Sequence, residues 1–467
     1  MLLATIAVAQ DSKSVLDDAA RALGAAALQS IEYSGTGATF PIGQAYGPGK
    51  PWPRFRMTAY TATIDFGAPA MRESLTRVDE ENPPRGGGAG PYIEATGQGS
   101  IRPIPFGPQT QNRQATGRTD PAFVQIALMT PQGFLKAAEA ERNATIATST
   151  RAGRRIQTIS FARGKHTVRG EINEKNLVDR VETEIDNGLL GDMAVETVFS
   201  DYKSFNGIMF PSHIVQRQGG HATLDLTVSA VRSNPGPLEI REGGPPGGPL
   251  RVEAESIADG VWFLNGGAPI SVLVEFADHL VVVEAPGSDA RSEAAIALAR
   301  RTVPNKPIRY VVNSHAHFDH SGGIRGFVAE GITVLTHRLN KPYFEQVLAN
   351  PHTISPDRLS RSPRPAMIEG VDDKRVLADG TRTLELHHMR GNLHNEALLM
   401  AYLPKEKLLI QADAMRPATT RPLPTPSPFT VNLWENIRRL KLDVERIVHL
   451  HGGFDSLAAL AKAAGRS

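Results

Sequence analysis

Four residues of metal-ligating types stand close together in the C-terminal half of this 467-residue chain: His315, His317, Asp319 and His320. Histidine is scarce, with 14 in the whole chain, so random placement rarely puts three within six positions beside an aspartate. Imidazole and carboxylate ligands together suit zinc, iron or manganese. The cluster therefore predicts a metal site, and the competing interpretation, a His-rich loop without metal, is much less favoured.

The residues around the cluster indicate how the chain presents it. A mostly apolar run, Ile308 to Val312, precedes the cluster, and the pair Gly322 and Gly323 follows it. This pattern predicts a strand that ends in a turn, and a helix that starts at Gly322. Because alternate side chains of an extended segment point the same way, His315 and His317 can bind one cation. Asp319 and His320 follow the strand end and can face a neighbouring position.

Three later segments each place one residue of a metal-ligating type beside an apolar stretch or a glycine motif. His394 lies in Gly391-Asn392-Leu393-His394, just before another apolar run. Asp413 follows Leu408 to Ala412 and is the only acid that closes a predicted strand between His394 and His451. His451 follows the apolar run from Ile447 and precedes Gly452.

Two of these later ligands have competitors nearby. The pair His387 and His388 competes with His394, but it lacks the flanking glycine, so a structural or supporting role is favoured for the pair. His449 competes with His451, but only His451 is followed by a glycine. His449 is instead interpreted as an imidazole that supports the ligands.

The order of these motifs, over about residues 251–455, resembles that of the metallo-β-lactamase superfamily. His-Ala-His-Phe-Asp-His looks like the H-x-H-x-D-H signature of that family. The resemblance implies an αβ/βα sandwich with two zinc ions at the sheet edge, iron or manganese being alternatives. It implies one ion on His315, His317 and His394, a second on Asp319, His320 and His451, and Asp413 as the bridge. Many members carry Asp where this chain has Glu284, which is expected to support a ligand histidine.

Two cations about 3.5–4 Å apart can share a hydroxide whose pKa is pulled toward neutrality. The expected function is therefore a zinc-dependent hydrolase that uses a metal-bridging hydroxide on an ester, thioester, lactone or phosphoester bond. Asp319 is the expected catalytic residue, because it can move the proton. β-Lactam cleavage ranks lower, since the resemblance implies that true β-lactamases usually lack the bridging Asp413.

Two further functions stay open as alternatives. The first is an iron-dependent enzyme of the same fold that carries out redox chemistry on oxygen or sulfur. The second is a periplasmic binding protein without catalysis, although retention of all seven ligand positions argues against it.

Composition limits the partners. The formal net charge of +2 predicts no strong attraction to nucleic acid or to anionic membranes. No run after the N-terminus is apolar enough over enough residues to span a membrane. The chain has no cysteine, which excludes disulfides and thiolate ligands. A small-molecule substrate is therefore expected, and the sequence indicates no particular oligomeric state.

A Pro/Gly-rich stretch at residues 233–250 predicts a linker between two domains. Residues 251–467 are expected to form the catalytic sandwich. Residues 10–232 are expected to form a β-rich domain with a curved antiparallel sheet, because segments such as Thr223 to Val228 alternate polar and apolar residues. Residues 155–232 weakly resemble lipoprotein-sorting domains, which implies a lid over the substrate; a plain structural role is favoured instead.

The first residues and two loops complete the expectations. Residues 1–9 are apolar and end in Ala7-Val8-Ala9, which resembles the end of a secretory signal and predicts a periplasmic or secreted protein. The Pro-rich loops His352 to Pro365 and Arg416 to Phe429 are expected to carry specificity. The second follows Asp413 closely and is expected to border the pocket.

Overall fold

The computed structural model describes residues 11–67, 70–81, 83–87, 101–102, 109–116, 129–141, 143–238, 250–416 and 426–466; for 101–102 and 109–116 the backbone alone is described. The predicted signal remnant at 1–9, residues 239–249 of the predicted linker and residues 417–425 of the second loop lie outside the described residues. Within these ranges, every helix is too short or too polar to cross a lipid bilayer.

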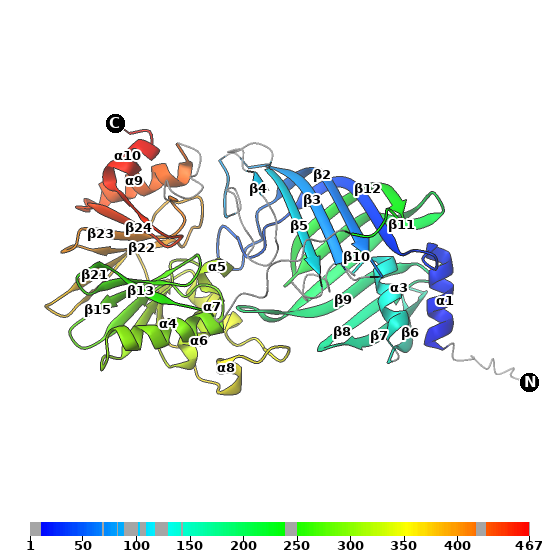
Figure 1. Ribbon diagram of the computed structural model, residues 1–467, viewed down its shortest axis with the longest axis horizontal. Coiled ribbons are helices and arrows are strands. Elements are labelled where there is room, and N and C mark those ends of the chain that lie inside the picture. The colour runs from blue at the N-terminus through cyan, green and yellow to red at the C-terminus, as the bar shows by residue number, and fades with distance from the viewer. Residues whose placement is uncertain are drawn as a thin grey trace, which may run out of the picture.

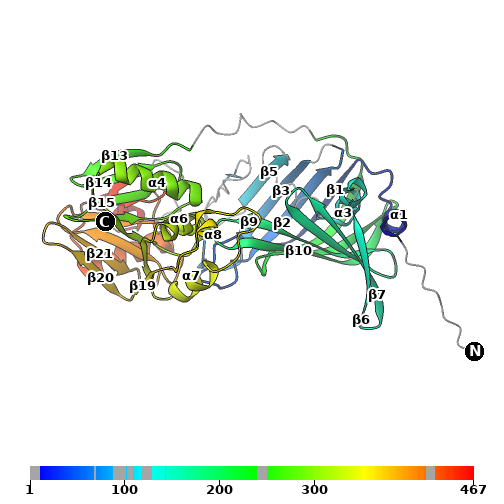
Figure 2. The same cartoon turned by 90° about the horizontal axis from the view of Figure 1, so that it is seen from below.

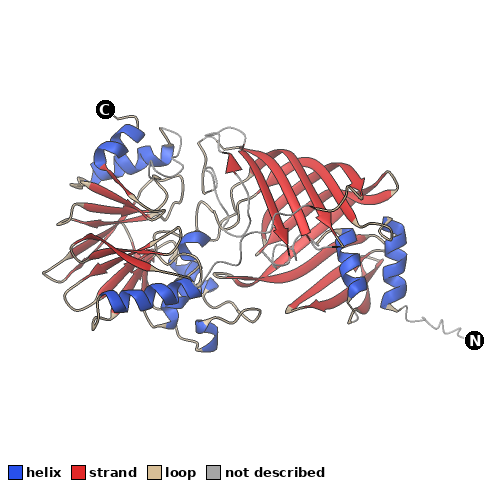
Figure 3. Cartoon of the chain, in the orientation of Figure 1, coloured by secondary structure: helices blue, strands red, loops and turns tan. Residues whose placement is uncertain are grey.

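One large antiparallel sheet dominates the N-terminal domain, as predicted (Figures 1 and 3). Its 12 strands are ordered β4-β5-β3-β2-β1-β12-β11-β10-β9-β8-β7-β6. They are β1 (Ser30–Thr39), β2 (Phe55–Asp65), β3 (Ala70–Asp79), β4 (Ile101–Arg102), β5 (Gln109–Thr116), β6 (Thr145–Arg151), β7 (Arg154–Arg163), β8 (His166–Ile172), β9 (Val178–Asn187), β10 (Gly191–Phe205), β11 (Ile208–Gln218) and β12 (His221–Ser233).

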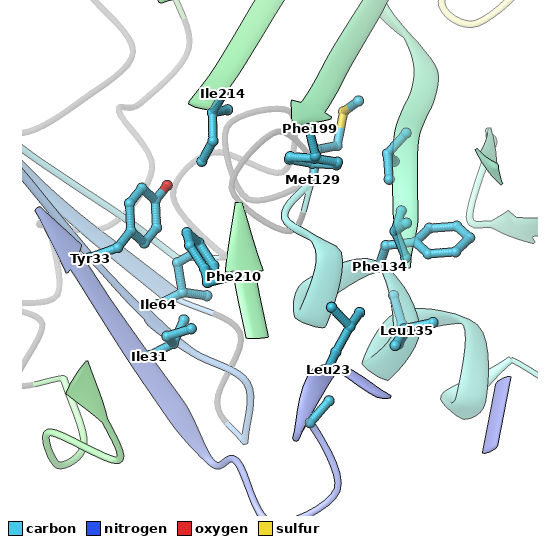
Figure 4. Close-up of a cluster of buried hydrophobic side chains, with 14 of the residues drawn as sticks. Leu23, Ile31, Tyr33, Ile64, Met129, Phe134, Leu135, Phe199, Phe210 and Ile214 are labelled. Carbon is cyan, nitrogen blue, oxygen red and sulfur yellow. The ribbon is translucent and has the colours of Figure 1, made fainter. Parts of the chain in front are cut away.

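Two helices cover one face of this sheet, namely α1 (Ser12–Leu23) and α3 (Pro131–Ala140) (Figure 1). The buried positions of α1 include Val15, Ala19 and Leu23, whose spacing of four places them on one side of the helix. Figure 4 shows the core that results, with Leu23 on a helix and Phe210 on a strand. Burial of these apolar side chains holds the helices on the sheet.

The sequence predicted β12 from its alternating residues, but it did not predict β1. Glycine argues against a strand interior, and β1 contains Gly35 and Gly37. Each of them faces a carbonyl oxygen of β12 so closely that a β-carbon would collide with it. The register with β12 shifts between Ser34 and Gly35. The strand therefore depends on glycine because two backbones approach closely at a bulge.

The C-terminal domain contains two sheets that face each other. The seven-stranded sheet runs in sequence order and consists of β13 (Glu253–Ala258), β14 (Val261–Asn265), β15 (Ser271–Glu275), β16 (Leu280–Val283), β17 (Ile308–Val312), β18 (Thr333–His337) and β19 (Ile368–Val371). The six-stranded sheet consists of β20 (Lys374–Ala378), β21 (Thr383–His388), β22 (Leu399–Leu403), β23 (Leu408–Gln411), β24 (Arg446–His449) and β25 (Phe454–Ser456).

Helices lie outside both sheets (Figure 2). They are α4 (Asp289–Thr302), α5 (Phe318–Ser321), α6 (Ile324–Ala329), α7 (Lys341–Val347), α8 (Arg358–Arg361), α9 (Pro428–Leu440) and α10 (Leu457–Ala463). Strand β16 is apolar throughout because it is buried on both faces. Val281 and Val283 belong to the core that the two sheets share, whereas Leu280 and Val282 pack with the helices α4 and α6. The predicted αβ/βα sandwich is confirmed.

Candidate metal centre

The cluster at 315–320 lies just beyond β17, where the chain turns into α5. His317 precedes the first residue of α5 with extended backbone angles, φ −62° and ψ 145°. The helix predicted to start at Gly322 is α6, which begins two residues later at Ile324, and the sequence did not predict the single turn of α5 that carries Asp319 and His320. Gly322 passes so close to the carbonyl oxygen of Gly287 that a β-carbon would collide with it. The glycine lets this turn pack tightly against the chain after β16.

The other three candidate ligands also follow strand ends in the facing sheet. His394 lies between β21 and β22, Asp413 two residues after β23, and His451 two residues after β24. Gly452 and Gly453 have φ values of 98° and 79°, which glycine adopts without strain. This turn carries the chain into β25 directly after His451. Loops at one edge of the sandwich therefore bring residues that are far apart in sequence to one place.

Three histidines, His315, His317 and His394, form the first group, here called the enclosed trio. One ring nitrogen from each lies within 4.8 Å of the other two. The Nε2 atoms of His315 and His394 are 3.3 Å apart. The Nδ1 atom of His317 is buried and has no hydrogen-bond partner. A buried nitrogen without a partner among other imidazole nitrogens fits a bound cation, because burial without a partner is otherwise costly.

Asp319, His320 and His451 form the second group, here called the open trio. One ligand atom from each lies within 4.8 Å of the others. The Nε2 atoms of His320 and His451 are 3.3 Å apart. The side chains of Asp319 and His451 keep 19% and 16% of their surface exposed, whereas His315 and His320 keep none. Solvent therefore reaches the centre from the side of the open trio.

Asp413 lies between the two trios. Its Oδ2 atom is 2.7 Å from His320 Nε2 and 3.5 Å from the Nε2 atoms of both His315 and His394. Its Oδ1 atom is 2.7 Å from His451 Nε2. One carboxylate thus touches members of both groups. This geometry fits an acid that bridges two cations.

Burial and charge set different protonation states in the two trios. Burial and the neighbouring imidazoles hold the pKa of His315 well below its usual value and lower the pKa of His317 to about 3. Burial opposes the charged form of His320 as well, but the nearby carboxylates outweigh it and raise its pKa well above the usual range. Burial favours the neutral form of Asp413, but the surrounding imidazoles outweigh it and lower its pKa. Neutral imidazoles and ionised carboxylates are the forms that bind cations.

Glu284 supports the open trio through a hydrogen bond to His320. It is fully buried and lies directly after β16. Its Oε2 atom accepts hydrogen bonds from His320 Nδ1 at 3.0 Å and from the Ser314 hydroxyl, and its Oε1 atom accepts from the Ser314 backbone N–H at 3.2 Å. With Nδ1 held in this way, Nε2 of His320 points toward Asp413. The supporting role predicted for Glu284 agrees with these contacts.

The competing histidines point elsewhere. His449 Nδ1 lies 2.6 Å from Gln411 Nε2 and 3.0 Å from the carbonyl oxygen of Met415. His387 Nε2 lies 2.8 Å from Glu385 Oε2, and His388 Nε2 lies 2.9 Å from the carbonyl oxygen of Glu396. None of these three joins a ligand group among the described residues. The ligand positions favoured by the glycine motifs are the ones that the structure brings together.

The sequence interpretation missed two residues that touch the centre from the N-terminal domain. Gln44 Nε2 donates a hydrogen bond to Asp319 Oδ1 at 3.0 Å. The carbonyl oxygen of Ala45 lies 2.7 Å from His317 Nε2. The Gly/Pro-rich composition of residues 41–53 marks a long irregular segment. Composition alone gives no indication of where such a segment packs.

A cavity of about 290 Å³ lies beside the centre, between the two domains. Its wall includes His317 and Asn395 from the C-terminal domain and Trp52, Met193 and His221 from the N-terminal domain. The wall combines apolar and aromatic side chains with polar ones, and Lys50 and Asp192 are its charged members.

Residues 265–451 match the family described as the Metallo-beta-lactamase superfamily. Among curated proteins, none matches the chain. Similar solved structures include a metallo-beta-lactamase from Hirschia baltica, which is 21% identical to this chain. The match covers 46% of this chain and 96% of the other, with a TM-score of 0.35. The one from Pontibacter korlensis is 16% identical and pairs 46% with 98% at 0.35. Rubredoxin oxygen:oxidoreductase from Desulfovibrio gigas is 18% identical and pairs 45% with 59% at 0.36.

Proposed function

We propose that this chain, whose residues 265–451 match the metallo-beta-lactamase superfamily, is a hydrolase that depends on two zinc ions. Imidazole with carboxylate is a ligand set that suits zinc. The observation that carries the proposal is the position of Asp413, whose two oxygens lie 2.7 Å from His320 and from His451 while one of them also faces the enclosed trio. A structural role would not require four imidazoles around one buried carboxylate.

In this proposal the enclosed trio holds one ion, the open trio holds the other, and Asp413 bridges them. A pair of such ions supplies Lewis acidity and lowers the pKa of a water molecule toward neutrality. The chain's own residues orient the ligands and handle the proton. Asp319 is the group for proton transfer, because its side chain is the more exposed carboxylate of the centre.

The substrates proposed first are esters, thioesters or lactones of small molecules. Phosphoesters rank second and β-lactams third, because a bridging acid such as Asp413 is not typical of β-lactamases. The size of the cavity supports a small molecule, since about 290 Å³ accommodates a compact group and not a polymer. Its aromatic wall supports an apolar portion on that molecule.

The test combines metal content with turnover. Purified protein is expected to contain close to two zinc ions per chain and to hydrolyse at least one member of a panel of ester, thioester, lactone, phosphodiester and β-lactam substrates. His317→Ala is expected to lose both metal and turnover. His166→Ala, which removes an imidazole on β8 of the N-terminal sheet, is the matched control and is expected to keep both.

Two results would contradict the proposal. Protein that binds no divalent metal under any loading condition would remove its basis. Protein that binds iron and transfers electrons to oxygen, without hydrolysis of any panel member, would favour the redox alternative.

A further inference from the structure

The segment between β1 and β2, residues 40–54, leaves the N-terminal sheet and reaches the metal centre (Figure 1). Its backbone contacts both ligand-bearing loops of the other domain. The Phe318 N–H donates to the carbonyl oxygen of Gly43 at 3.3 Å, and the Glu396 N–H donates to that of Tyr46 at 2.8 Å. This segment, called the β1–β2 segment below, therefore packs between the loop that carries His317 and the loop that carries His394.

Two polar groups of this segment contact proposed metal ligands directly. The carbonyl oxygen of Ala45 accepts hydrogen bonds from His317 Nε2 at 2.7 Å and from Asn395 Nδ2 at 3.1 Å. Because a carbonyl oxygen can only accept, Nε2 of His317 carries the proton and Nδ1 keeps its lone pair. That Nδ1 atom is the buried nitrogen without a partner. The N-terminal domain thus selects the tautomer of His317 that can bind a cation.

Gln44 contacts a ligand of the open trio, Asp319. Its side-chain amide donates to Oδ1 of Asp319 at 3.0 Å, while Oδ2 of Asp319 lies 3.5 Å from His320 Nε2. Gln44 is itself only 3% exposed. A buried donor on one carboxylate oxygen fixes the plane of the carboxylate and leaves the other oxygen free for a cation.

The surrounding chain fits Gln44 closely. The Gly87 N–H donates to the carbonyl oxygen of Gln44 at 2.9 Å, and the Gly86 N–H donates to that of Leu393 at 2.8 Å. A β-carbon at Gly87 would collide with the side-chain oxygen of Gln44, and one at Gly43 would collide with the ring of Phe318. Close packing against Gly87, together with the hydrogen bond to Asp319, therefore fixes the position of the Gln44 side chain.

We propose that the β1–β2 segment is part of the metal centre, with Gln44 and the Ala45 carbonyl as positioning groups for Asp319 and His317. The N-terminal domain then controls how tightly the ions are held. This inference rests on the proposed function, because it requires that the cluster binds metal. It goes beyond that function by assigning a role to a domain that lies outside the residues matching the family.

The first experiment measures zinc affinity by competition with a chromophoric chelator, for the full chain and for Gln44→Ala. Loss of an outer partner of a ligand typically weakens metal binding about 10- to 100-fold. We expect this loss for one of the two ions, the one on the open trio, and little change for the other. Cobalt-loaded protein gives a second measurement, since its visible absorption spectrum should change when Asp319 is no longer held.

Lys50→Ala is the matched control. Lys50 lies in the same segment and pairs with Glu396 at 2.7 Å across the same domain contact, but it touches no proposed ligand. We expect unchanged zinc affinities and an unchanged cobalt spectrum for this variant. A loss equal to that of Gln44→Ala would show that the segment acts only by holding the domains together, which would overturn the role given to Gln44.

Gly87→Ala tests the same idea with Gln44 present. The added methyl group must displace the Gln44 amide, because the two occupy the same space. The variant is expected to reproduce the weakened binding and the altered cobalt spectrum of Gln44→Ala. Gln44→Glu, of similar size, places a second negative charge beside Asp319 and should also alter the spectrum. These variants keep the inference testable if Gln44→Ala itself fails to fold.

The outcomes separate this inference from the proposed function. If the unchanged chain binds no metal, the proposed function fails. If the unchanged chain binds two ions and Gln44→Ala and Gly87→Ala bind both with the same affinities, only the role of the β1–β2 segment fails.

Discussion

The enclosed trio and the open trio use the same kinds of ligand but differ in their surroundings. His315 and His317 are fully or almost fully buried, and burial lowers the pKa of each. In the open trio, Asp319 and His451 reach solvent, and carboxylates raise the pKa of His320. His315 and His317 are therefore already in the neutral form that binds a cation, whereas His320 must release a proton first.

This difference predicts two unequal sites within one centre. An ion on the enclosed trio should bind first and leave last, because His315 and His317 are neutral and shielded from water. An ion on the open trio should exchange more readily, because solvent approaches from that side. The following predictions test this inequality, in order of expected effect.

Asp413→Ala should have the largest effect, because Asp413 touches both trios. We expect zinc affinity to fall by more than about 100-fold at both sites, since loss of a mere outer partner already costs about 10- to 100-fold. Metal content after dialysis measures this directly. Asp443→Ala, which changes an exposed carboxylate near α9, serves as the control. A variant that retained two ions would show that Asp413 is not the bridge.

Substitution of one ligand in each trio should give unequal results. His317→Ala is expected to remove the ion of the enclosed trio, and His451→Ala only the ion of the open trio. His451→Ala should therefore retain about one zinc per chain with nearly normal affinity. Titration with zinc under a competing chelator distinguishes the two. If the ion that remains were bound with equal affinity in the two variants, the inequality of the sites would be contradicted.

Glu284→Gln should weaken the open trio more than the enclosed trio. The amide keeps the size of the side chain but has one accepting oxygen, so it cannot accept at both positions as Oε1 and Oε2 of the carboxylate do. We expect about 10- to 100-fold weaker binding of the ion on the open trio and a smaller change for the other, which Glu284 reaches only through the contact of Ser314 with His315. Glu275→Gln, on β15 and paired with Lys306 at the surface, controls for the loss of one charge. Equal weakening of both ions would mean that Glu284 supports the fold and not one site.

Acid should weaken the open trio at a higher pH than the enclosed trio. The raised pKa of His320 means that it keeps its proton to higher pH than an ordinary imidazole before metal binds, so binding must release that proton. Each unit by which pH falls then costs about tenfold in affinity for that ion. His317, with a pKa near 3, loses no affinity from its own protonation over the same range. Calorimetry in buffers of different ionisation enthalpy counts the protons released, and release of none would contradict this prediction.

The C-terminal fold was readable from sequence because its signals are local. The apolar run from Ile308 to Val312 coincides with β17. Gly452, which marks the turn after β24, directly follows His451 and not His449. The N-terminal sheet was readable only in part. Strands with regular alternation, such as β12, were predicted, whereas β1 was not, because its glycines serve a contact with β12 nearly 200 residues away.

Residue types and spacing were enough to nominate the cluster at 315–320, because metal chemistry allows few side chains, and the resemblance to a known family added His394, Asp413 and His451. Only the tertiary structure decided that Ala45 and Gln44 form hydrogen bonds with two of those ligands, His317 and Asp319. Neither a backbone carbonyl nor a buried amide leaves a chemical signature in a sequence, and both reach their partners across more than 270 positions. Contacts at such separation arise from how two domains pack, which no short stretch of residues encodes.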